Sequence, residues 1–331
     1  MDLKLLLKRG ALLAAANWPA VAIQFVAETT FQMLLAVPVI GAAILVAVLL
    51  GANLGELLQG TLRDIFTTIA SALMAEPGAF VAFVAAFAVV LLGGSILMFL
   101  VKGGIVDVLV AAHRAAGPIE REPITFETFH SALTFTLPRF GGGCARLFRR
   151  YLALGLALMA VYAVSGGAYL AFAVYGYRAA AGRFVLGWTF IAAIAAVLLV
   201  VWITVVNLLY LLTQVAVAVD DVGPADGFVA VLRFIRAAFR ELLGVAGVVL
   251  AMVVAATLVS ALAWSGVGLI AFVPLVGLAV IPLQLAALLI RGLVFEYLGL
   301  TALGAYVTLY VGRVTLPDAV TARAELDSAR L

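Results

Sequence analysis

Residues 228–242, FVAVLRFIRAAFREL, lie between two long apolar runs at 184–219 and 242–264. Their apolar side chains recur at the spacing of one helix face, and the basic residues of the other face are Arg233, Arg236 and Arg240. The stretch 126–151 repeats this arrangement between two apolar runs, with Arg139, Arg146, Arg149 and Arg150. About 20 apolar residues are enough for a helix to cross a bilayer. The pattern therefore predicts an all-α, multi-pass membrane protein with basic amphipathic segments on one membrane face.

The composition argues against a soluble domain. Of the 331 residues, 66% are hydrophobic and 11% are charged, and the mean hydropathy is +1.24, whereas soluble domains are about half apolar and about a quarter charged. The net charge of +3 is small and the basic residues are spread along the chain, which argues against nucleic-acid binding. The single cysteine, Cys144, excludes a disulfide framework and a cysteine-based metal site. The excess of arginine over lysine, with abundant alanine and glycine, is typical of bacterial genomes rich in G and C.

Six segments are long and apolar enough to be membrane spans, and together they form one transmembrane domain, 1–315. We predict these spans near 19–50, 79–112, 151–176, 184–219, 242–264 and 271–312. The last segment is long for one crossing, and Pro274 and Pro282 would interrupt a helix at its start. It can form one long kinked span or two spans that turn near Arg291-Gly292, although such a turn would leave almost no loop.

The distribution of basic residues predicts the topology. Almost all Lys and Arg residues fall in the N-terminal segment, the connection after the second span, the connection after the fourth span and the C-terminal tail. The exceptions are Arg63, Arg178, Arg183 and Arg291. Because basic connections stay on the cytoplasmic side, we expect a bacterial inner-membrane protein with both termini in the cytoplasm. Two termini on one side require an even number of spans, which favours six.

Amphipathic segments flank and separate the spans. We predict helices lying in the membrane interface near 2–17, 54–75, 125–140 and 225–238. Gly141-Gly142-Gly143 is expected to break the helix after the third of these segments. Both basic stretches follow an even-numbered span, so we expect two loosely repeated halves in parallel orientation. The polar tail, 316–331, is expected to be irregular.

Three parts of the chain resemble one group of bacterial proteins. The segment 215–224, VAVAVDDVGP, ends a span with acidic residues and Gly-Pro, and its continuation to Arg236 is an Arg-rich amphipathic helix. The segment 103–129 is its counterpart in the first half, and 303–310 is similar to the last span of that group. These features resemble bacterial six-span proteins grouped with the membrane domain of glycerophosphodiester phosphodiesterases and with YciC-like inner-membrane proteins. The resemblance implies an integral inner-membrane protein and, since no phosphodiesterase domain accompanies it, transfers no catalytic residue.

Charged residues inside the predicted spans are the candidates for a polar site, and they are Glu28, Arg291 and Glu296. Charged side chains in a bilayer normally face a cavity or pair with each other. They can therefore line a pathway for an ion, a proton or a substrate, form an ion pair in which Arg291 satisfies a carboxylate, or snorkel to an interface. Further polar side chains in the spans serve helix–helix hydrogen bonds or a polar cavity. These are Gln24, Gln32, Asn207, Gln214 and Gln284.

The arginines of the two basic stretches are candidate contacts for phospholipid headgroups, because a guanidinium group suits phosphate. These candidates are Arg146, Arg149, Arg150, Arg233, Arg236 and Arg240. These arginines can also be explained without any specifically bound lipid, because they can snorkel to the membrane interface and can set the topology. Asp220 and Asp221 end the fourth span, where they can cap the next helix or pair with these arginines.

No motif in the sequence indicates catalytic or cofactor chemistry. His113 and His130 lack partners at zinc-ligand spacing, and the triple glycine lacks the Lys of a phosphate-binding loop. Neither Gly-x-Ser-x-Gly nor His-Glu-x-x-His occurs. We therefore expect no catalytic residue, no cofactor and no metal.

The expected function is non-enzymatic and belongs to the cell envelope, with membrane lipids as partners. The protein would act as a transporter-like module for lipids or small solutes, or as a membrane scaffold for a protein partner or a second copy. The alternative is an intramembrane lipid-modifying enzyme that uses Glu28 and Glu296 as acid and base. That alternative requires both carboxylates to converge on a water-accessible cavity.

Overall fold

The computed structural model describes residues 2–50, 77–121, 126–180, 184–271 and 276–328. Its helices are α1 (Leu3–Ala16), α2 (Trp18–Leu50), α5 (Pro77–Ala115), α6 (Phe126–Ser131), α7 (Leu137–Ala180), α8 (Val185–Asp220), α9 (Pro224–Ala271) and α10 (Val276–Ser328). The described residues contain no β-strand, so the protein is all-α, as predicted. The interfacial helix predicted at 54–75 lies outside the described residues.

Six of the described helices, namely α2, α5, α7, α8, α9 and α10, are long and apolar enough to cross a bilayer. The chain is therefore an integral, multi-pass membrane protein. The alternative of two spans turning near Arg291-Gly292 is wrong, because both residues lie inside the continuous helix α10. Helix α10 begins at Val276 and already contains Pro282, whose missing N–H removes one backbone hydrogen bond near the start of the helix.

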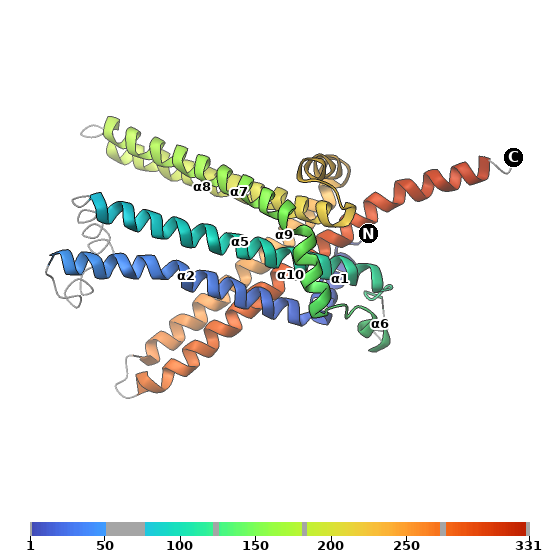
Figure 1. Ribbon diagram of the computed structural model, residues 1–331, viewed down its shortest axis with the longest axis horizontal. Helices are drawn as coiled ribbons and strands as arrows, with labels where there is room; N and C mark the ends of the chain where they lie inside the picture. The colour runs from blue at the N-terminus through green and yellow to red at the C-terminus, as the bar shows by residue number, and fades with distance from the viewer. Residues whose placement is uncertain (1, 51–76, 122–125, 181–183, 272–275, 329–331) are drawn as a thin grey trace.

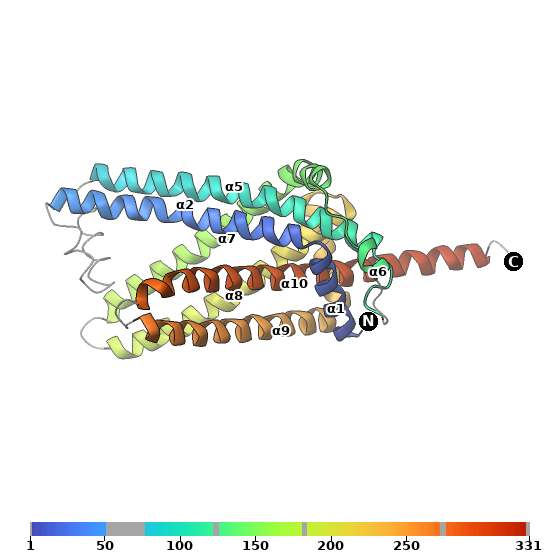
Figure 2. The ribbon, with the colours of Figure 1, turned by 90° about the horizontal axis from the view of Figure 1, so that it is seen from below.

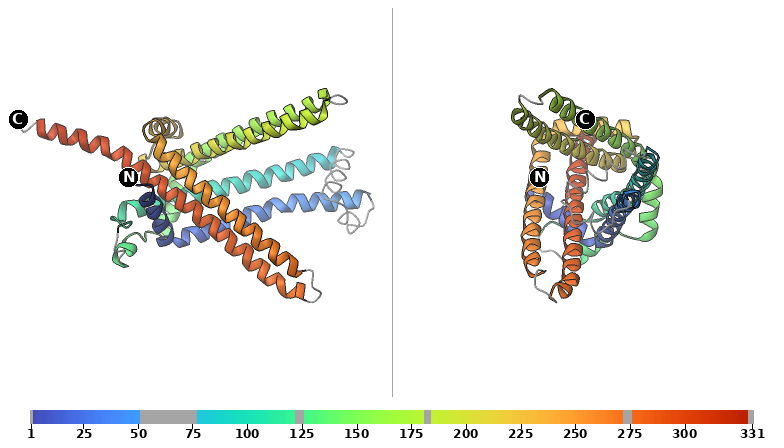
Figure 3. Two further views of the ribbon diagram at one scale, coloured as in Figure 1. Left: turned by 180° about the vertical axis from the view of Figure 1, so that it is seen from behind. Right: turned by 90° about the vertical axis from the view of Figure 1, so that its left-hand side faces the viewer.

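The spans pair into three hairpins, α2 with α5, α7 with α8, and α9 with α10 (Figures 1 and 3). The hairpins diverge at one end of the molecule and converge at the other, where α1 and α6 lie (Figures 1 and 2). We call the converging end the closed end. The parallel repeat of two halves stays a prediction.

The buried core lies at the closed end. Buried side chains concentrate on one face of α1, on α5 from Phe99 onward, on 212–218 of α8 and on 300–310 of α10. The diverging halves of the spans instead expose large apolar side chains, such as Val164 on α7 and Leu186 on α8. In a bilayer these side chains contact lipid, whose acyl chains are as apolar as leucine.

Helix α1 belongs to this core. The predicted interfacial helix 2–17 exists, but its apolar face, including Leu6 and Leu13, is buried. It crosses α10 closely, because Gly10 faces Gly304, where a Cβ would stand only 3.1 Å from the Gly10 Cα. Small residues at both positions let two helix backbones approach each other.

Asn17, at the corner between α1 and α2, is fully buried, and both polar atoms of its side chain form hydrogen bonds. Its side-chain amide donates to the carbonyl oxygens of Leu13 at 3.0 Å and Ala132 at 2.9 Å. Its side-chain oxygen accepts from the backbone N–H groups of Thr134 at 3.1 Å and Phe135 at 3.0 Å. The corner is thereby tied to the chain between α6 and α7.

The single interfacial helix predicted at 125–140 is wrong. The structure has the short α6, an irregular segment at 132–136, and then α7 from Leu137. Two causes explain the interruption: Asn17 binds backbone N–H groups that a helix would use, and Pro138 suits the first turn of a new helix. The basic residues from Arg139 to Arg150 therefore belong to the first turns of a spanning helix.

The expected helix break at Gly141–Gly143 is also wrong, because α7 runs through all three residues. Close packing explains the glycine at the third position, where a Cβ would stand 2.6 Å from the Cβ of Asp107 on α5. The other predicted interfacial helix, 225–238, is observed as the first part of α9. It ends at a kink where Ala238 has φ −126° and ψ 26°, and Figure 1 shows it nearly end-on beside the span.

The C-terminal segment differs from expectation as well. Helix α10 continues to Ser328, so the tail is helical over most of 316–331 instead of irregular. Alanine and leucine make up seven of the sixteen residues of this segment, and both favour helix.

Candidate functional site

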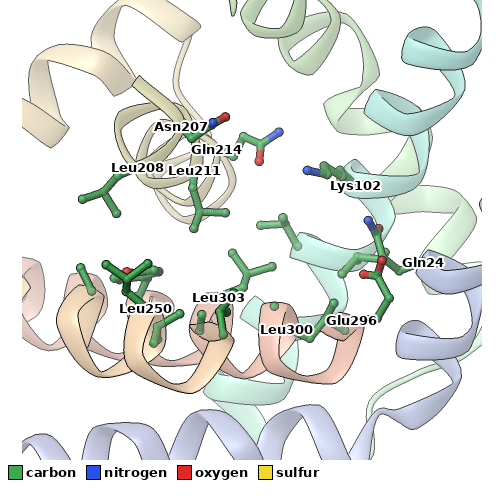
Figure 4. A pocket seen from close by; sticks show the side chains of 18 of the residues that line it. Gln24, Lys102, Asn207, Leu208, Leu211, Gln214, Leu250, Glu296, Leu300 and Leu303 are labelled. Carbon is green, nitrogen blue, oxygen red and sulfur yellow. The ribbon is translucent and has the colours of Figure 1, made fainter. Parts of the chain in front are cut away.

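A cavity of about 450 Å³ lies among α2, α5, α8, α9 and α10. Leucines from three helices form much of its wall, and Figure 4 labels Leu208, Leu211, Leu250, Leu300 and Leu303. Polar side chains line the rest, namely Gln24, Glu28, Lys102, Thr204, Asn207, Gln214 and Glu296. The cavity therefore combines apolar walls with a few polar side chains, which is the usual character of a small-molecule site.

The cavity opens towards the surroundings of the spans. Leu250 on α9 lines it and is still 57% exposed. Thr204 and Asn207 on α8 also line it and are exposed. Because these residues belong to membrane-spanning helices, the opening faces lipid when the protein is in a bilayer.

Three charged side chains meet at the cavity from three different helices. Glu28 comes from α2, Lys102 from α5 and Glu296 from α10, and each is half-buried. Lys102 interacts electrostatically with both carboxylates, and the two carboxyl groups also interact with each other. A hydrogen bond between two carboxyl groups requires a shared proton, so the three groups together carry one negative and one positive charge.

Gln214 is a polar residue of the cavity whose side chain is buried without a hydrogen-bond partner in the described part of the chain. Its side chain is 1% exposed, yet neither amide atom has a hydrogen-bond partner among the described residues. A buried polar group without a partner costs about 1–3 kcal/mol. The Tyr151 hydroxyl donates a hydrogen bond to the backbone carbonyl oxygen of Gln214 at 2.8 Å, and this bond holds that part of α8 in place. Figure 4 shows the Gln214 amide and the Lys102 amine pointing towards each other inside the cavity.

Two of the three predicted intramembrane charges, Glu28 and Glu296, line this cavity, and Arg291 does not. Arg291 and Glu296 are five positions apart in the sequence, which places them about 140° apart around a helix. Arg291 is exposed, lies over the Phe295 ring at 5.7 Å from its centroid, and lines a separate hollow between α9 and α10. The ion pair between Arg291 and a carboxylate, one of the three alternatives for these charges, is absent from the described residues.

Lys102 provides the cation of the site, and the sequence analysis missed it. In the prediction of topology, Lys102 counts with the basic residues of the connection after the second span, although the predicted span 79–112 contains it. The continuous helix α5 instead carries it into the bundle, with buried Val101 before it and buried Ile105 after it. Apolar residues on both sides of a lone lysine are the sequence feature that could have identified it.

Two of the predicted headgroup arginines form ion pairs within the protein. Arg146 contacts Asp107 at 2.5 Å and Asp221 at 3.1 Å, and Arg150 contacts Asp221 at 2.5 Å. Asp221 ends α8 with φ 55°, the one left-handed non-glycine residue among those described, a conformation that aspartate tolerates. The hydrogen bond from Arg150 lowers the pKa of Asp221 below its ordinary value. The acidic end of the fourth span thus pairs with the basic stretch, one of the two roles expected for it.

The remaining headgroup candidates lie at the closed end. Arg233 lines a hollow with Asp220 and Tyr310, and the Tyr310 hydroxyl donates to Asp220 at 2.5 Å. Arg240 lines another hollow beside Glu241 and α1. Arg149 and Arg236 are exposed and have no ion-pair partner among the described residues. Lipid contact by these four arginines stays a prediction.

A buried ion pair that the sequence did not indicate joins α1 to the end of α5. The Arg9 guanidinium group donates to Glu120 at 2.6 Å, and both side chains are 10% exposed. It also donates to the carbonyl oxygens of His113, Ala116 and Gly117. Carbonyl groups at a helix C-terminus lack partners within the helix, so Arg9 caps α5 from another element. The arrangement lies outside the cavity and ties α1 to the end of α5.

The described residues contain no group of three or more His, Cys, Asp or Glu side chains placed to hold a metal ion. Comparisons of the chain with protein-family models, curated proteins and solved structures found no significant match. The geometry of the cavity is therefore the basis for the function proposed below.

Proposed function

We propose that this protein binds an amphipathic molecule, a lipid or a lipid-like solute, in the cavity between its hairpins, and that its role in the envelope is non-enzymatic. The observation that carries the proposal is the combination of leucine-lined walls, three charged groups and an opening that faces the bilayer. A lipid-like molecule matches all three features, since its chains suit the opening and its headgroup suits the polar region. A soluble metabolite would have to cross apolar surface to arrive there.

Binding can be tested with the full chain in nanodiscs, by native mass spectrometry of lipids retained after detergent exchange. Leu211→Trp fills the cavity and should reduce retained lipid severalfold. Val197→Trp is the matched control, because Val197 is on the same helix but is exposed and does not line the cavity. Equal lipid retention by both variants would remove the proposal.

A transporter-like role would require the charged groups of the cavity, whereas a scaffold role would not. Flux of labelled lipid or solute in proteoliposomes should occur if the protein is transporter-like, and Glu28→Gln or Glu296→Gln should reduce it. Absence of flux in every preparation, together with a partner that co-purifies at fixed stoichiometry, would favour the scaffold.

The second candidate is an intramembrane lipid-modifying enzyme. The observation in its favour is that Glu28 and Glu296 line the same cavity, which is what paired acid–base catalysis requires. Incubation with a defined lipid followed by mass spectrometry distinguishes the two, because binding leaves the mass of the lipid unchanged and an enzyme alters it.

We further propose that the closed end faces the cytoplasm of a bacterium and that the protein is related to the six-span group it resembles. The support is the gathering of α1, the start of α7 and the start of α9 at this end (Figure 1), together with their basic residues. Cysteine labelling in intact cells tests the orientation, with the native Cys144 replaced by serine as background. Labelling of an engineered Arg149→Cys by an impermeant reagent would contradict it.

A further inference from the structure

We infer that the cavity receives a zwitterionic headgroup with a primary ammonium and a phosphate, the ammonium near Glu28 and Glu296 and the phosphate near Lys102 and Gln214. This inference rests on the proposed function and names the class of its ligand. It follows from the charges of the cavity, the placement of its polar groups and its size.

The charges of the cavity balance one another. Glu28 and Glu296 hydrogen-bond to each other and so share one proton, which leaves one negative charge on the pair against the one positive charge of Lys102. A buried charge without compensation is unfavourable in a low-dielectric environment. A zwitterionic headgroup keeps this balance, because it brings one positive and one negative charge, whereas a purely anionic headgroup leaves one negative charge uncompensated.

The polar groups are also separated by type. Lys102 and Gln214 point towards each other, and Gln24 lies beside Glu296 on the other side of Lys102 (Figure 4). Lysine and a side-chain amide both donate hydrogen bonds to phosphate oxygens. The unpartnered amide of Gln214, 1% exposed, is the observation independent of charge that points to a missing polar ligand.

The size of the cavity matches a headgroup and not a whole lipid. About 450 Å³ lies within the usual range of small-molecule pockets. A headgroup with its glycerol fits, and acyl chains would leave past the exposed Leu250 into the bilayer. A neutral diacylglycerol would fill the apolar part but would leave the amide of Gln214 without a partner.

The test compares lipids with identical acyl chains and different headgroups on the wild-type chain in nanodiscs, by competition native mass spectrometry. The probes are phosphatidylethanolamine, phosphatidylcholine, phosphatidylglycerol and diacylglycerol. We expect phosphatidylethanolamine to be preferred over each of the others by about tenfold, which is the worth of one hydrogen bond to a charged group. Phosphatidylcholine is the informative comparison, because its quaternary amine has the charge but cannot donate.

Variants test which residues bind the ammonium and which bind the phosphate of the headgroup. Glu296→Gln should abolish the preference for ethanolamine over glycerol headgroups, and Lys102→Met should abolish the preference for phospholipid over diacylglycerol. Arg291→Gln is the matched control, because Arg291 is a charge of the same helix outside the cavity, and it should preserve both preferences. The panel on the wild-type chain remains decisive even if a variant does not fold.

The outcomes separate this inference from the proposed function. If all headgroups compete equally but Leu211→Trp still reduces binding, a lipid occupies the cavity without headgroup selection and the inference fails alone. A preference for phosphatidylglycerol would also overturn it. If Leu211→Trp has no effect on any lipid, both the inference and the proposed function fail.

Discussion

Replacing Arg9 by methionine should destabilise the protein strongly, although Arg9 lies in the short N-terminal helix. The variant removes the partner of a carboxylate that is 10% exposed and leaves three carbonyl groups at the end of α5 without their donor. Breaking a buried ion pair by removing one partner costs about 3–5 kcal/mol. For a protein of this size such a loss lowers the melting temperature by about 5–15 °C.

The assay is thermal unfolding of purified protein in one detergent, followed by size-exclusion of the remaining monodisperse fraction. Glu120→Gln should cost less than Arg9→Met, because an amide still accepts a hydrogen bond. The double variant Arg9→Met/Glu120→Met should recover part of the loss, since it leaves no unpaired charge. Arg236→Met is the matched control, because Arg236 is exposed, and its shift should stay within about 2 °C.

Two results would refute the reasoning. One is a shift for Arg9→Met no larger than that for Arg236→Met. The other is a double variant whose loss equals the sum of the two single losses, since that would mean that Arg9 and Glu120 do not interact.

Three further predictions concern the packing at the closed end. Gly304→Val should destabilise by about 1–3 kcal/mol, because the added atoms meet the backbone of Gly10 and cannot be relieved by a side-chain rotation. Asn17→Ala should cost about 2–4 kcal/mol, because it leaves buried backbone groups of two segments without partners. Asp221→Asn should lower the melting temperature at neutral pH, and its effect should shrink in 1 M NaCl, since the pair is exposed and screened. Because Arg150 lowers the pKa of Asp221 below the ordinary 3.8, the stabilisation is present above that value and is lost as the pH falls through the folded-state pKa.

Each of these predictions has a control and is measured by the same thermal assay. Gly312→Val on α10 meets no atom within 4 Å and should be nearly neutral, so equal shifts at Gly304 and Gly312 would contradict the close crossing. Ser131→Ala, an exposed position near the segment that Asn17 holds, should change little. An effect of Asp221→Asn that is unchanged by salt would show that the charge of Asp221 is not what stabilises the end of α8.

The spans and the position of the kink were predictable because they depend on neighbouring residues. An apolar run such as 184–219 forms a helix in a bilayer whatever surrounds it, since its backbone must satisfy its own hydrogen bonds. The amphipathic stretch before residue 238 and the apolar stretch after it prefer different environments. The structure accordingly bends α9 at Ala238.

Errors arose where a distant residue changes a local preference. Gly141 to Gly143 predicted a helix break, yet the helix continues, and the last of these glycines lies against Asp107 of α5, where a Cβ would not fit. The helix predicted at 125–140 is interrupted because Asn17, more than a hundred residues earlier, binds its backbone N–H groups. Neither partner can be recognised from the segment itself.

The sequence by itself determined the class of the protein, the six spans and the presence of unusual charges within them, because hydropathy and helix period are local properties. Only the tertiary structure decided which charges share a site. It brings Glu28, Lys102 and Glu296 to one cavity from three helices and turns Arg291 to another face of α10. The physical reason is that the partner of an intramembrane charge is chosen by the rotation and crossing of helices, and these depend on close contacts such as Gly10 against Gly304.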